Sequence, residues 1–541
     1  MIRISPNINI RISKDFLIKG KQFFSRYENL LIILILSLLS ITCFIIFLQN
    51  HLGLAYNDSR SHLDIGRRVV EGLKPGLAQL GSVWLPLPHL LMVPTIWNDF
   101  MWHSGLSGAI QSMISYVATG LVINLFLKQL KVNSLGRFVG IAVFALNYNI
   151  LYLQSTAMTE LILIATMTIG VYELLLYHQK GSVFLLVRSS FWIMLSTLVR
   201  YDGWFLFLYS AALVALYALR KKRVQMSEGS FILFSTLAGF GIFMWVIWNT
   251  IIFKDPLYFI LGPYSAHAQQ EQLSEAGVLI TKNNIVQSVQ TYWYSMSYNT
   301  GLVVLILGII GAFLLFFDKK IDLNIRLATT ALLAPLIFNI VALYFGFSVL
   351  FIQGVNGDTW FNVRYGVMMM PSIAIFIGYL IQRLKPARWI IIGILCIVIS
   401  FSFFSNDAVT IDDGRVGSSQ KNVTEVSDWL AENTRNKPGF ILISAASHDA
   451  IIFSTGLPMS HFIHEGTGTY WLNATTIPDR WARWIVMRTN DVNDQTFRLV
   501  NKSGQLSKYT LVNSYPFADI YELKTEYLPT LNTQPVLGKQ K

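Results

Sequence analysis

The segment YNDSRSHLDIGRRVVEG (56–72) holds two side chains suited to acid–base chemistry, Asp58 and His62. On a helix, at about 100° per residue, they lie one turn apart on the same side as Ile65 and Val69. A carboxylate directed toward an apolar surface can accept a proton from a substrate hydroxyl. It can equally cap the first turn of an interfacial helix, and the sequence is compatible with both roles.

The opposite arc of the same helix is densely charged. Because charged side chains are rarely buried without partners, the pattern predicts that this arc faces water. Asp58 and His62 would then face the rest of the chain. The charged arc comprises Arg60, Asp64, Arg67, Arg68, Glu71 and Lys74.

A second carboxylate, Glu160 in TAMTE, stands at the start of a long apolar segment. An acid near the hydrocarbon boundary is costly unless it is paired or hydrated, which favours a functional role. The alternative is a Glu placed at a helix start, where the helix dipole stabilises negative charge.

Two Arg-Tyr pairs stand at the ends of other apolar segments, Arg200-Tyr201-Asp202 and Arg364-Tyr365. A guanidinium offers a planar fork of donors that matches phosphate oxygens. The alternative for Arg200 is an ion pair with Asp202 or Glu160. The alternative for Arg364 is an anchor whose charged head reaches the membrane surface.

The composition identifies a membrane protein. Hydrophobic residues make up 53% of the 541 residues and charged residues only 13%. The net charge of +12 comes from basic residues in short segments between apolar runs, a pattern that sets membrane topology and does not indicate nucleic-acid binding. Cys43 and Cys396 both lie in apolar runs and predict neither a disulfide framework nor a metal site.

About eleven apolar runs approach the ~20 residues that a helix needs to cross a bilayer. The first follows a basic leader and lacks a small-residue cleavage site, so it is predicted to be a retained helix. The boundary between the runs at 183–198 and 204–219, near residues 200–203, is the least distinct one. The runs are 30–48, 104–127, 138–153, 158–177, 183–198, 204–219, 231–253, 301–317, 328–350, 365–381 and 389–404.

The positive-inside rule gives one consistent topology, in which alternate connections carry the Lys and Arg residues. The basic leader is then cytoplasmic, and the segments with Asp58, Glu160, Arg200 and Arg364 are extracytoplasmic. The chain is expected to be an integral protein of a prokaryotic cell membrane. Its predicted parts are a leader at 1–28, a membrane domain at 29–405 with a first external loop at 50–103, and an external domain at 406–541.

The part after 405 is less hydrophobic and predicts a soluble α/β domain. A helix is expected at 423–435, with strands at 439–444 and 515–523. Ligands of open α/β folds lie at the carboxyl ends of strands. The polar residues after the first strand are therefore candidates for an acceptor or metal site, although ordinary hydrogen-bonded loop residues are the favoured interpretation: His448, Asp449, His461, His464 and Glu465.

The first external segment resembles that of GT-C membrane glycosyltransferases, in particular the family 39 group of protein O-mannosyltransferases and aminoarabinose transferases. That group carries an acid, an aromatic residue at the fifth position, a second acid two residues on, and glycines. VWLPLPHLL (83–91) resembles its double-proline element, with Trp84 and His89. The matching residues of the first segment are Asp58, His62, Asp64, Ile65, Gly66, Arg67 and Gly72.

The chain departs from this group at two positions. Ser59 stands where many relatives have Glu, and the Lys that often precedes the double proline is absent. Because this Lys is absent, the resemblance implies that Arg364, Arg200 or His89 binds the phosphate.

The resemblance implies an enzyme that transfers a sugar from a polyprenyl-phosphate donor to an acceptor, with inversion. Asp58 would be the general base, and Glu160, the family's second external acid, would orient the acceptor or hold a divalent cation such as Mg²⁺ or Mn²⁺ together with Asp58. The acceptor, whether protein, lipid or glycan, stays open. The alternatives are a secondary transporter, a polyprenyl-linked glycan polymerase or ligase, and a receptor with an external sensor domain.

Overall fold

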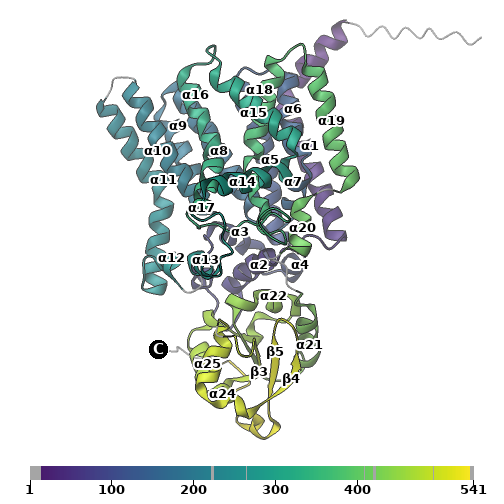
Figure 1. Ribbon diagram of the computed structural model, residues 1–541, viewed down its shortest axis with the longest axis vertical. Coiled ribbons are helices and arrows are strands. Elements are labelled where there is room, and N and C mark those ends of the chain that lie inside the picture. Colours follow the sequence, from purple (N-terminus) through teal and green to yellow (C-terminus); the bar gives the residue numbers. More distant parts are fainter. Residues whose placement is uncertain are drawn as a thin grey trace, which may run out of the picture.

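The computed structural model describes residues 14–220, 224–262, 265–406, 408–417, 422–491 and 493–535. Figure 1 shows a bundle of long helices with a small α/β domain at one end. A layer of short helices, which includes α2 and α3, lies between the bundle and this domain.

Eight helical segments within the described residues are long and apolar enough to cross a membrane. A ninth crossing results if α14 (Ile285–Thr300) and α15 (Leu302–Phe317), which are bent by 108° at Gly301, form one broken span. The eight contain α1 (Lys14–Gln49), α5 (Leu106–Gln129), α8 (Glu160–Lys180), α10 (Asp202–Arg220), α11 (Val224–Phe253), α16 (Leu323–Thr329) with η2 (Thr330–Leu333) and α17 (Ala334–Tyr344), η3 (Val363–Met369) with α18 (Met370–Arg383), and α19 (Arg388–Ser405) with α20 (Val409–Val416).

The predicted count of about eleven spans is therefore not confirmed. The two runs that account for the difference are α6 (Ser134–Ala145) and α9 (Val183–Thr197), apolar helices of 12 and 15 residues. At 1.5 Å per residue they extend only about 18–22 Å, less than the ~30 Å hydrocarbon layer. The predicted break near residue 200 is confirmed, because α9 ends at Thr197 and α10 begins at Asp202.

The predicted basic loops gather at the end of the bundle away from the α/β domain (Figure 1). There Glu28 forms ion pairs with Lys128 and Arg137, and Arg383 pairs with Asp318. The start of the leader (1–13) and basic residues 221–223 lie outside the described residues. The arrangement separates the basic loops from the predicted site residues, whereas the orientation of the two ends in the cell stays a prediction.

Short helices occupy the end of the bundle nearest the α/β domain. The first external segment folds into four of them, and the other three come from later connections. They are α2 (Asn57–Val70), η1 (Leu77–Leu80), α3 (Leu87–Ile96), α4 (Asp99–His103), α7 (Tyr148–Leu153), α12 (Tyr258–Leu261) and α13 (Ala266–Glu275).

The α/β domain contains a five-stranded mixed sheet in the order β2-β1-β3-β5-β4. β1 pairs in parallel with β2 and β3, and β5 pairs antiparallel with β3 and β4. The predicted strands and the predicted helix near 423–435 are confirmed. The elements are β1 (Phe440–Ile443), β2 (Phe462–Ile463), β3 (Ala482–Met487), β4 (Tyr509–Ser514), β5 (Asp519–Leu523), α21 (Thr424–Thr434), α22 (Ala445–Thr455), α23 (Thr469–Thr476), α24 (Pro478–Trp481) and α25 (Gln495–Ser503).

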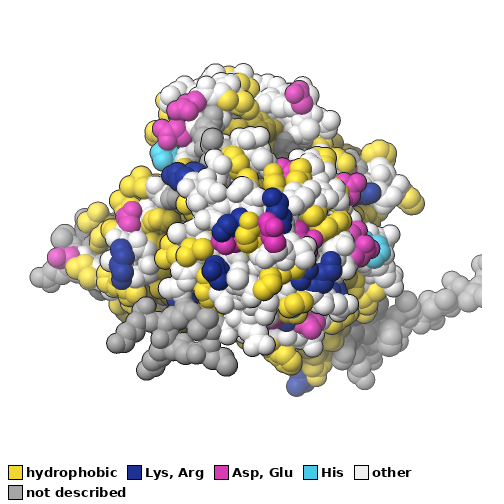
Figure 2. All heavy atoms as spheres, turned by 90° about the horizontal axis from the view of Figure 1, so that it is seen from below, with side chains coloured by type: hydrophobic (Ala, Val, Ile, Leu, Met, Phe, Trp, Pro, Cys, Tyr) yellow, Lys and Arg dark blue, Asp and Glu magenta, His cyan; other side chains and the backbone are white. Residues whose placement is uncertain are grey.

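Seen from the end that carries the α/β domain, the surface mixes basic and acidic side chains with apolar ones (Figure 2). The sheet interior, by contrast, is apolar, since every residue of β1 is buried and β3 is buried at all positions but one. An apolar sheet under a mixed polar surface is the arrangement expected of a domain in water.

The prediction that the charged arc of α2 faces water is wrong. Asp64, Arg67 and Arg68 are buried, because α2 lies between the membrane helices and the α/β domain. Arg68 forms an ion pair with Asp449 of α22, with 2.9 Å between Nη1 and Oδ1. Helical projection could not reveal that a later domain covers the charged face of α2.

Candidate active site

The centre of the candidate site is the guanidinium of Arg364, which η3 places beside the ends of α2 and α8. Its Nη2 donates to Asp58 Oδ2 at 2.6 Å, and its Nε donates to Glu160 Oε1 at 3.0 Å. Three residues predicted separately from the sequence therefore meet at one group. Arg364 is only 3% exposed, so the alternative of a membrane-surface anchor is wrong for this residue.

Arg200 extends the network on the far side of Glu160. Its Nη1 donates to the same Glu160 Oε1 at 3.2 Å, and its Nε lies 3.5 Å from Asp202 Oδ2. Both ion pairs named as alternatives for Arg200 thus exist. The ring of Tyr365 lies against both arginines, with its centroid 4.7 Å from Arg200 Cζ and 5.5 Å from Arg364 Cζ. The two cations and the aromatic ring form one wall of the site.

A fourth carboxylate, Asp413 of α20, joins the site although the sequence did not predict it. Its Oδ2 accepts a hydrogen bond from the Tyr56 hydroxyl at 3.0 Å and lies 3.7 Å from Arg364 Nη1. Burial, together with the negative charge of Asp413, raises the pKa of Tyr56, which keeps its hydroxyl protonated as a donor. The signal available in the sequence was the polar run TIDDGR directly after the last apolar run.

The acids differ sharply in accessibility. The side chain of Asp58 is 32% exposed, whereas those of Glu160 and Asp413 are completely buried. Asp58 is also not the N-cap of α2, because that position belongs to Tyr56, which makes no side-chain capping bond. Asp58 is therefore the carboxylate of this trio that a substrate can reach.

Several polar atoms of the network lack hydrogen-bond partners within the described part of the chain. They are two donors, Arg364 Nη1 and Arg200 Nε, and two acceptors, Glu160 Oε2 and Asp413 Oδ1. Buried polar groups are nearly always satisfied in folded proteins. A cluster of unsatisfied ones beside an accessible carboxylate marks a place where a polar ligand completes the bonding.

His62 and His89 form a buried pair next to this network. His62 Nδ1 and His89 Nε2 lie 2.8 Å apart, and the His62 ring packs on Trp84 with centroids 4.4 Å apart. Burial and the positive charges of Arg364 and Arg200 lower the pKa of His62 to about 3. Burial also places the pKa of His89 well below its ordinary value. Both rings are therefore neutral near pH 7 and can donate and accept one hydrogen bond each.

The remaining candidates of the membrane half make other contacts. Asp64 Oδ1 accepts from Trp102 Nε1 at 3.1 Å, and Arg67 donates to the backbone oxygens of Ile96 and Trp97. Tyr201 donates from its hydroxyl to Val83 O at 3.3 Å. These contacts fasten the segments around α3 and α4 to α2 and the bundle, and none of them is to the Arg364 network.

Four of the five candidates of the α/β domain have partners of their own, whereas His461 Nδ1 makes no hydrogen bond within the described residues. His448 Nε2 lies 2.8 Å from Asp494 Oδ2, and His464 Nδ1 accepts from Gly466 N. Glu465 accepts from Ser444 and from the backbone N–H of Ala445, where it stabilises the start of α22. The fourth candidate is Asp449, paired with Arg68 as described above. These contacts match the interpretation of hydrogen-bonded structural residues.

The raised pKa values of Asp64 and Asp449 predict that the stability of the folded protein depends on pH. Burial, and then the nearby Asp449 charge, raise the pKa of Asp64, while burial raises the pKa of Asp449 to about 6. Both acids hold protons in the folded state that the unfolded chain releases above about pH 4. Stability therefore falls as the pH rises from about 4 through 6. The thermal unfolding midpoint of the detergent-solubilised protein, measured from pH 4 to pH 8, checks this expectation.

Asp64→Asn isolates the contribution of this residue. Asparagine keeps the acceptor for Trp102 and mimics the protonated acid, so we expect the midpoint to fall less with rising pH than in the wild type. Asp428→Asn, an exposed acid on α21, is the matched control. An unchanged slope in Asp64→Asn would contradict the assignment.

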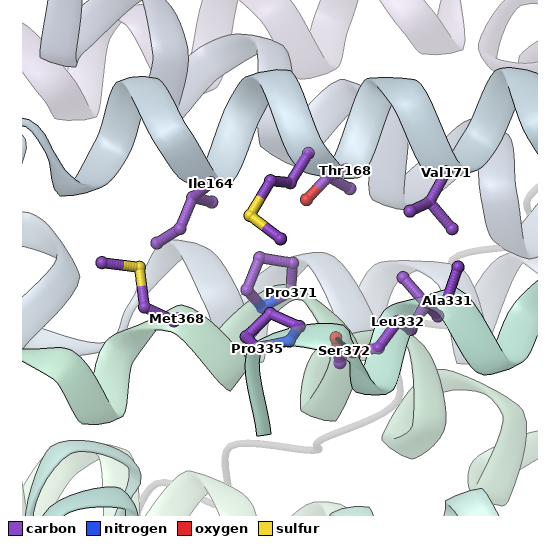
Figure 3. A pocket seen from close by; sticks show the side chains of 10 residues that line it. Ile164, Thr168, Val171, Ala331, Leu332, Pro335, Met368, Pro371 and Ser372 are labelled. Carbon is purple, nitrogen blue, oxygen red and sulfur yellow. Dashed lines mark hydrogen bonds between the residues drawn. The ribbon is translucent and has the colours of Figure 1, made fainter. Parts of the chain in front are cut away.

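Two partly open cavities lie away from this network. Figure 3 shows a mainly apolar cavity of about 20 Å³ between α8, η2, α17 and α18, lined by residues that include Ile164, Met368 and Pro371. A second cavity, of about 220 Å³, is lined by Asn147, Asn149 and the chain around the α14–α15 bend. None of the predicted site residues lines either of these two cavities.

The predicted cation site of Asp58 and Glu160 does not fit the observed arrangement. The guanidinium of Arg364 lies between the two carboxylates and donates to both, so it already supplies the positive charge that a cation would bring there. Within the described residues, no group of three or more His, Cys, Asp or Glu side chains is placed to hold a metal ion.

Comparisons with known proteins give a match in structure only. No family model and no curated protein matches the sequence. The crystal structure of ArnT from Cupriavidus metallidurans bound to undecaprenyl phosphate matches with a TM-score of 0.52 at 10% identity, over 90% of this chain and 98% of that one. The archaeal oligosaccharyltransferase AglB from Archaeoglobus fulgidus, in complex with an inhibitory peptide and a dolichol-phosphate, gives a TM-score of 0.48 at 11% identity, over 93% of this chain and 75% of that one.

The first of these matches extends over both the membrane helices and the α/β domain. ArnT is a GT-C aminoarabinose transferase, and the resemblance read from the sequence is confirmed at the level of the fold. The chain is a polytopic helical membrane protein with the architecture of GT-C membrane glycosyltransferases.

Proposed function

We propose that this protein is a glycosyltransferase that moves a sugar from a polyprenyl-phosphate donor to an acceptor at the extracytoplasmic face of the membrane. One observation carries the proposal. A partly exposed carboxylate, Asp58, is held by a buried arginine, Arg364, whose Nη1 makes no hydrogen bond within the described residues. A base beside a guanidinium that can still donate a hydrogen bond suits transfer from a phosphate-linked donor.

In the proposed reaction Asp58 is the general base. With Oδ2 bound to Arg364, Oδ1 takes the proton of the acceptor hydroxyl as the acceptor oxygen forms its bond to the anomeric carbon. The bond from that carbon to the phosphate oxygen breaks, and its electron pair stays on the lipid phosphate. Attack from the side opposite the phosphate inverts the anomeric configuration.

Arg364 and Arg200 would bind the phosphate through Nη1 and Nε, which make no hydrogen bond within the described residues and lie 3.7 and 3.5 Å from the carboxylates of Asp413 and Asp202. Charge-assisted hydrogen bonds to the departing phosphate stabilise its growing negative charge, so its protonation is unnecessary. Glu160 would hold the two guanidinium groups at a common spacing, since both donate to its Oε1. No step of this scheme passes through a cation.

Incubation of the purified protein with a panel of radiolabelled polyprenyl-phosphate sugars tests the proposal directly. We expect release or transfer of the sugar from at least one donor, and no reaction with the same sugars on a polyprenol without phosphate. Turnover of none of the donors by a folded protein would overturn the proposal and favour the secondary transporter. The anomeric configuration of the product, read by NMR, tests inversion.

A further inference from the structure

The chain after the last long membrane helix contacts both ends of α2. At the start of α2, Asp413 of α20 accepts the hydrogen bond from Tyr56. At the other end, Arg68 pairs with Asp449, and Glu71 Oε1 accepts from the backbone N–H of Met459 at 2.9 Å. The helix that carries Asp58 is thus held between two parts of a segment that the sequence assigned to a separate external domain.

The contact at the start of α2 is tightly built. Tyr56 occupies the N-cap position, two residues before Asp58, and is 1% exposed. A Cβ atom added at Gly414 would lie 3.3 Å from the Tyr56 ring and 3.1 Å from the Tyr152 hydroxyl, so α20 packs closely on both side chains. The position of α20 therefore fixes the position of the Tyr56 ring.

α20 is itself fastened to the membrane domain. The backbone N–H and the hydroxyl of Thr410 both donate to Asn149 Oδ1 of α7, at 3.0 and 2.8 Å. Asp413, one turn further along α20, is therefore held at a defined place before it contacts Tyr56. Its carboxylate contacts two groups of the site, the Tyr56 hydroxyl and, at 3.7 Å, Arg364 Nη1.

Tyr56 also contacts Arg364 directly, with 4.9 Å between its ring centroid and Cζ. Asp413, Tyr56 and Arg364 thus form a closed triangle of contacts, and Asp58 is attached to two of its corners. One attachment is the hydrogen bond to Arg364, and the other is the two-residue link to Tyr56 along the chain. Movement of any one corner changes the distance between the base and the guanidinium.

We propose that Asp413 is a positioning residue for sugar transfer, which acts through Tyr56 and Arg364 to fix Asp58 relative to the donor phosphate. This inference rests on the proposed function. It also gives the external segment a role, since the part of the chain after the last long membrane helix completes the active site. Asp413 need not touch the substrate, because its carboxylate is completely buried behind these two residues.

A double-mutant cycle on the full-length enzyme tests the proposal. Asp413→Asn removes the charge beside Arg364, and Tyr56→Phe removes the hydroxyl. We expect each to lower kcat by roughly tenfold or more, with a smaller change of KM for the donor. Because both interrupt the same set of contacts, the double variant should be no slower than the slower single variant. Fully additive losses would overturn the proposal.

The neighbouring Asp412→Asn is the matched control, because Asp412 is exposed on the same helix. We expect it to keep wild-type kcat. Loss of folded protein alone would lower the active fraction and leave the KM for the donor and the kcat per folded molecule unchanged.

The outcomes separate this inference from the proposed function. If the wild type transfers sugar and Asp413→Asn behaves like Asp412→Asn, the positioning role is wrong and the function stands. If the wild type transfers no sugar from any donor, the function itself fails. Should Asp413→Asn not fold, Tyr56→Phe alone carries the test, and wild-type kcat in that variant would overturn the proposal.

Discussion

We expect the replacement of Asp58 with Asn to abolish sugar transfer while the protein stays folded. Asparagine preserves the shape of the side chain and an oxygen for Arg364 but cannot take the proton of the acceptor hydroxyl. General bases contribute about 10²–10⁴-fold to such reactions, and we expect a loss of kcat of at least this size. Because the Asp58 side chain is 32% exposed, the loss of its charge should change the thermal unfolding midpoint little.

The assay measures initial rates of transfer from the donor found to be active, together with equilibrium binding of that donor. Asp358→Asn, an exposed acid of the loop that precedes Arg364, is the matched control and should keep wild-type activity. We expect Asp58→Asn to retain donor binding, because the phosphate contacts belong to the arginines. Near-wild-type turnover in Asp58→Asn would exclude its role as the base.

Arg364→Lys should have the second-largest effect. Lysine keeps the positive charge, but its single ammonium cannot donate in fork geometry to Asp58 and Glu160 together while it also binds phosphate. Loss of one donor to a developing negative charge costs roughly 10²–10³-fold in kcat. The buried Glu160 would also lose a partner, so we expect a lower unfolding midpoint as well.

Arg383→Lys provides a control on the same span, because Arg383 lies at the opposite end of α18 and pairs with Asp318. We expect it to keep wild-type kcat/KM. Binding of the donor by the two variants, measured with a labelled polyprenyl phosphate, separates loss of phosphate contacts from loss of stability. Equal kcat/KM values for the two variants would contradict the role of Arg364.

Much of the membrane architecture was predictable because hydrophobic run length reports directly on bilayer crossing. The runs at 138–153 and 183–198 form the helices α6 and α9 of only 12 and 15 residues, so run length overestimated the length of these two helices. It also gave no warning of the 108° bend at Gly301 between α14 and α15. The sequence there shows only a glycine beside a polar stretch, and the bend depends on packing in three dimensions.

The site was predictable residue by residue but not as an arrangement. Asp58, Glu160, Arg200 and Arg364 attracted attention because ionisable groups near apolar runs are costly. The attachment of Asp58 and Glu160 to the one guanidinium of Arg364 was not foreseeable, because Arg364 lies 306 and 204 positions away from them. Asp413 was missed because, within a polar segment, a carboxylate carries no local sign that it will be buried.

The long sequence separation between these contact partners determines the order in which the site forms during synthesis and folding. Asp58 and Arg364 are 306 positions apart, Tyr56 and Asp413 are 357 apart, and Arg68 and Asp449 are 381 apart. α2 leaves the ribosome early, whereas its partners are among the last segments to be made. Contacts of such long range close late in folding. A chain released before these partners are made carries Asp58 without the residues that hold it. If the proposed function is right, catalytic competence therefore arises only after Asp413 and Asp449 have been synthesised.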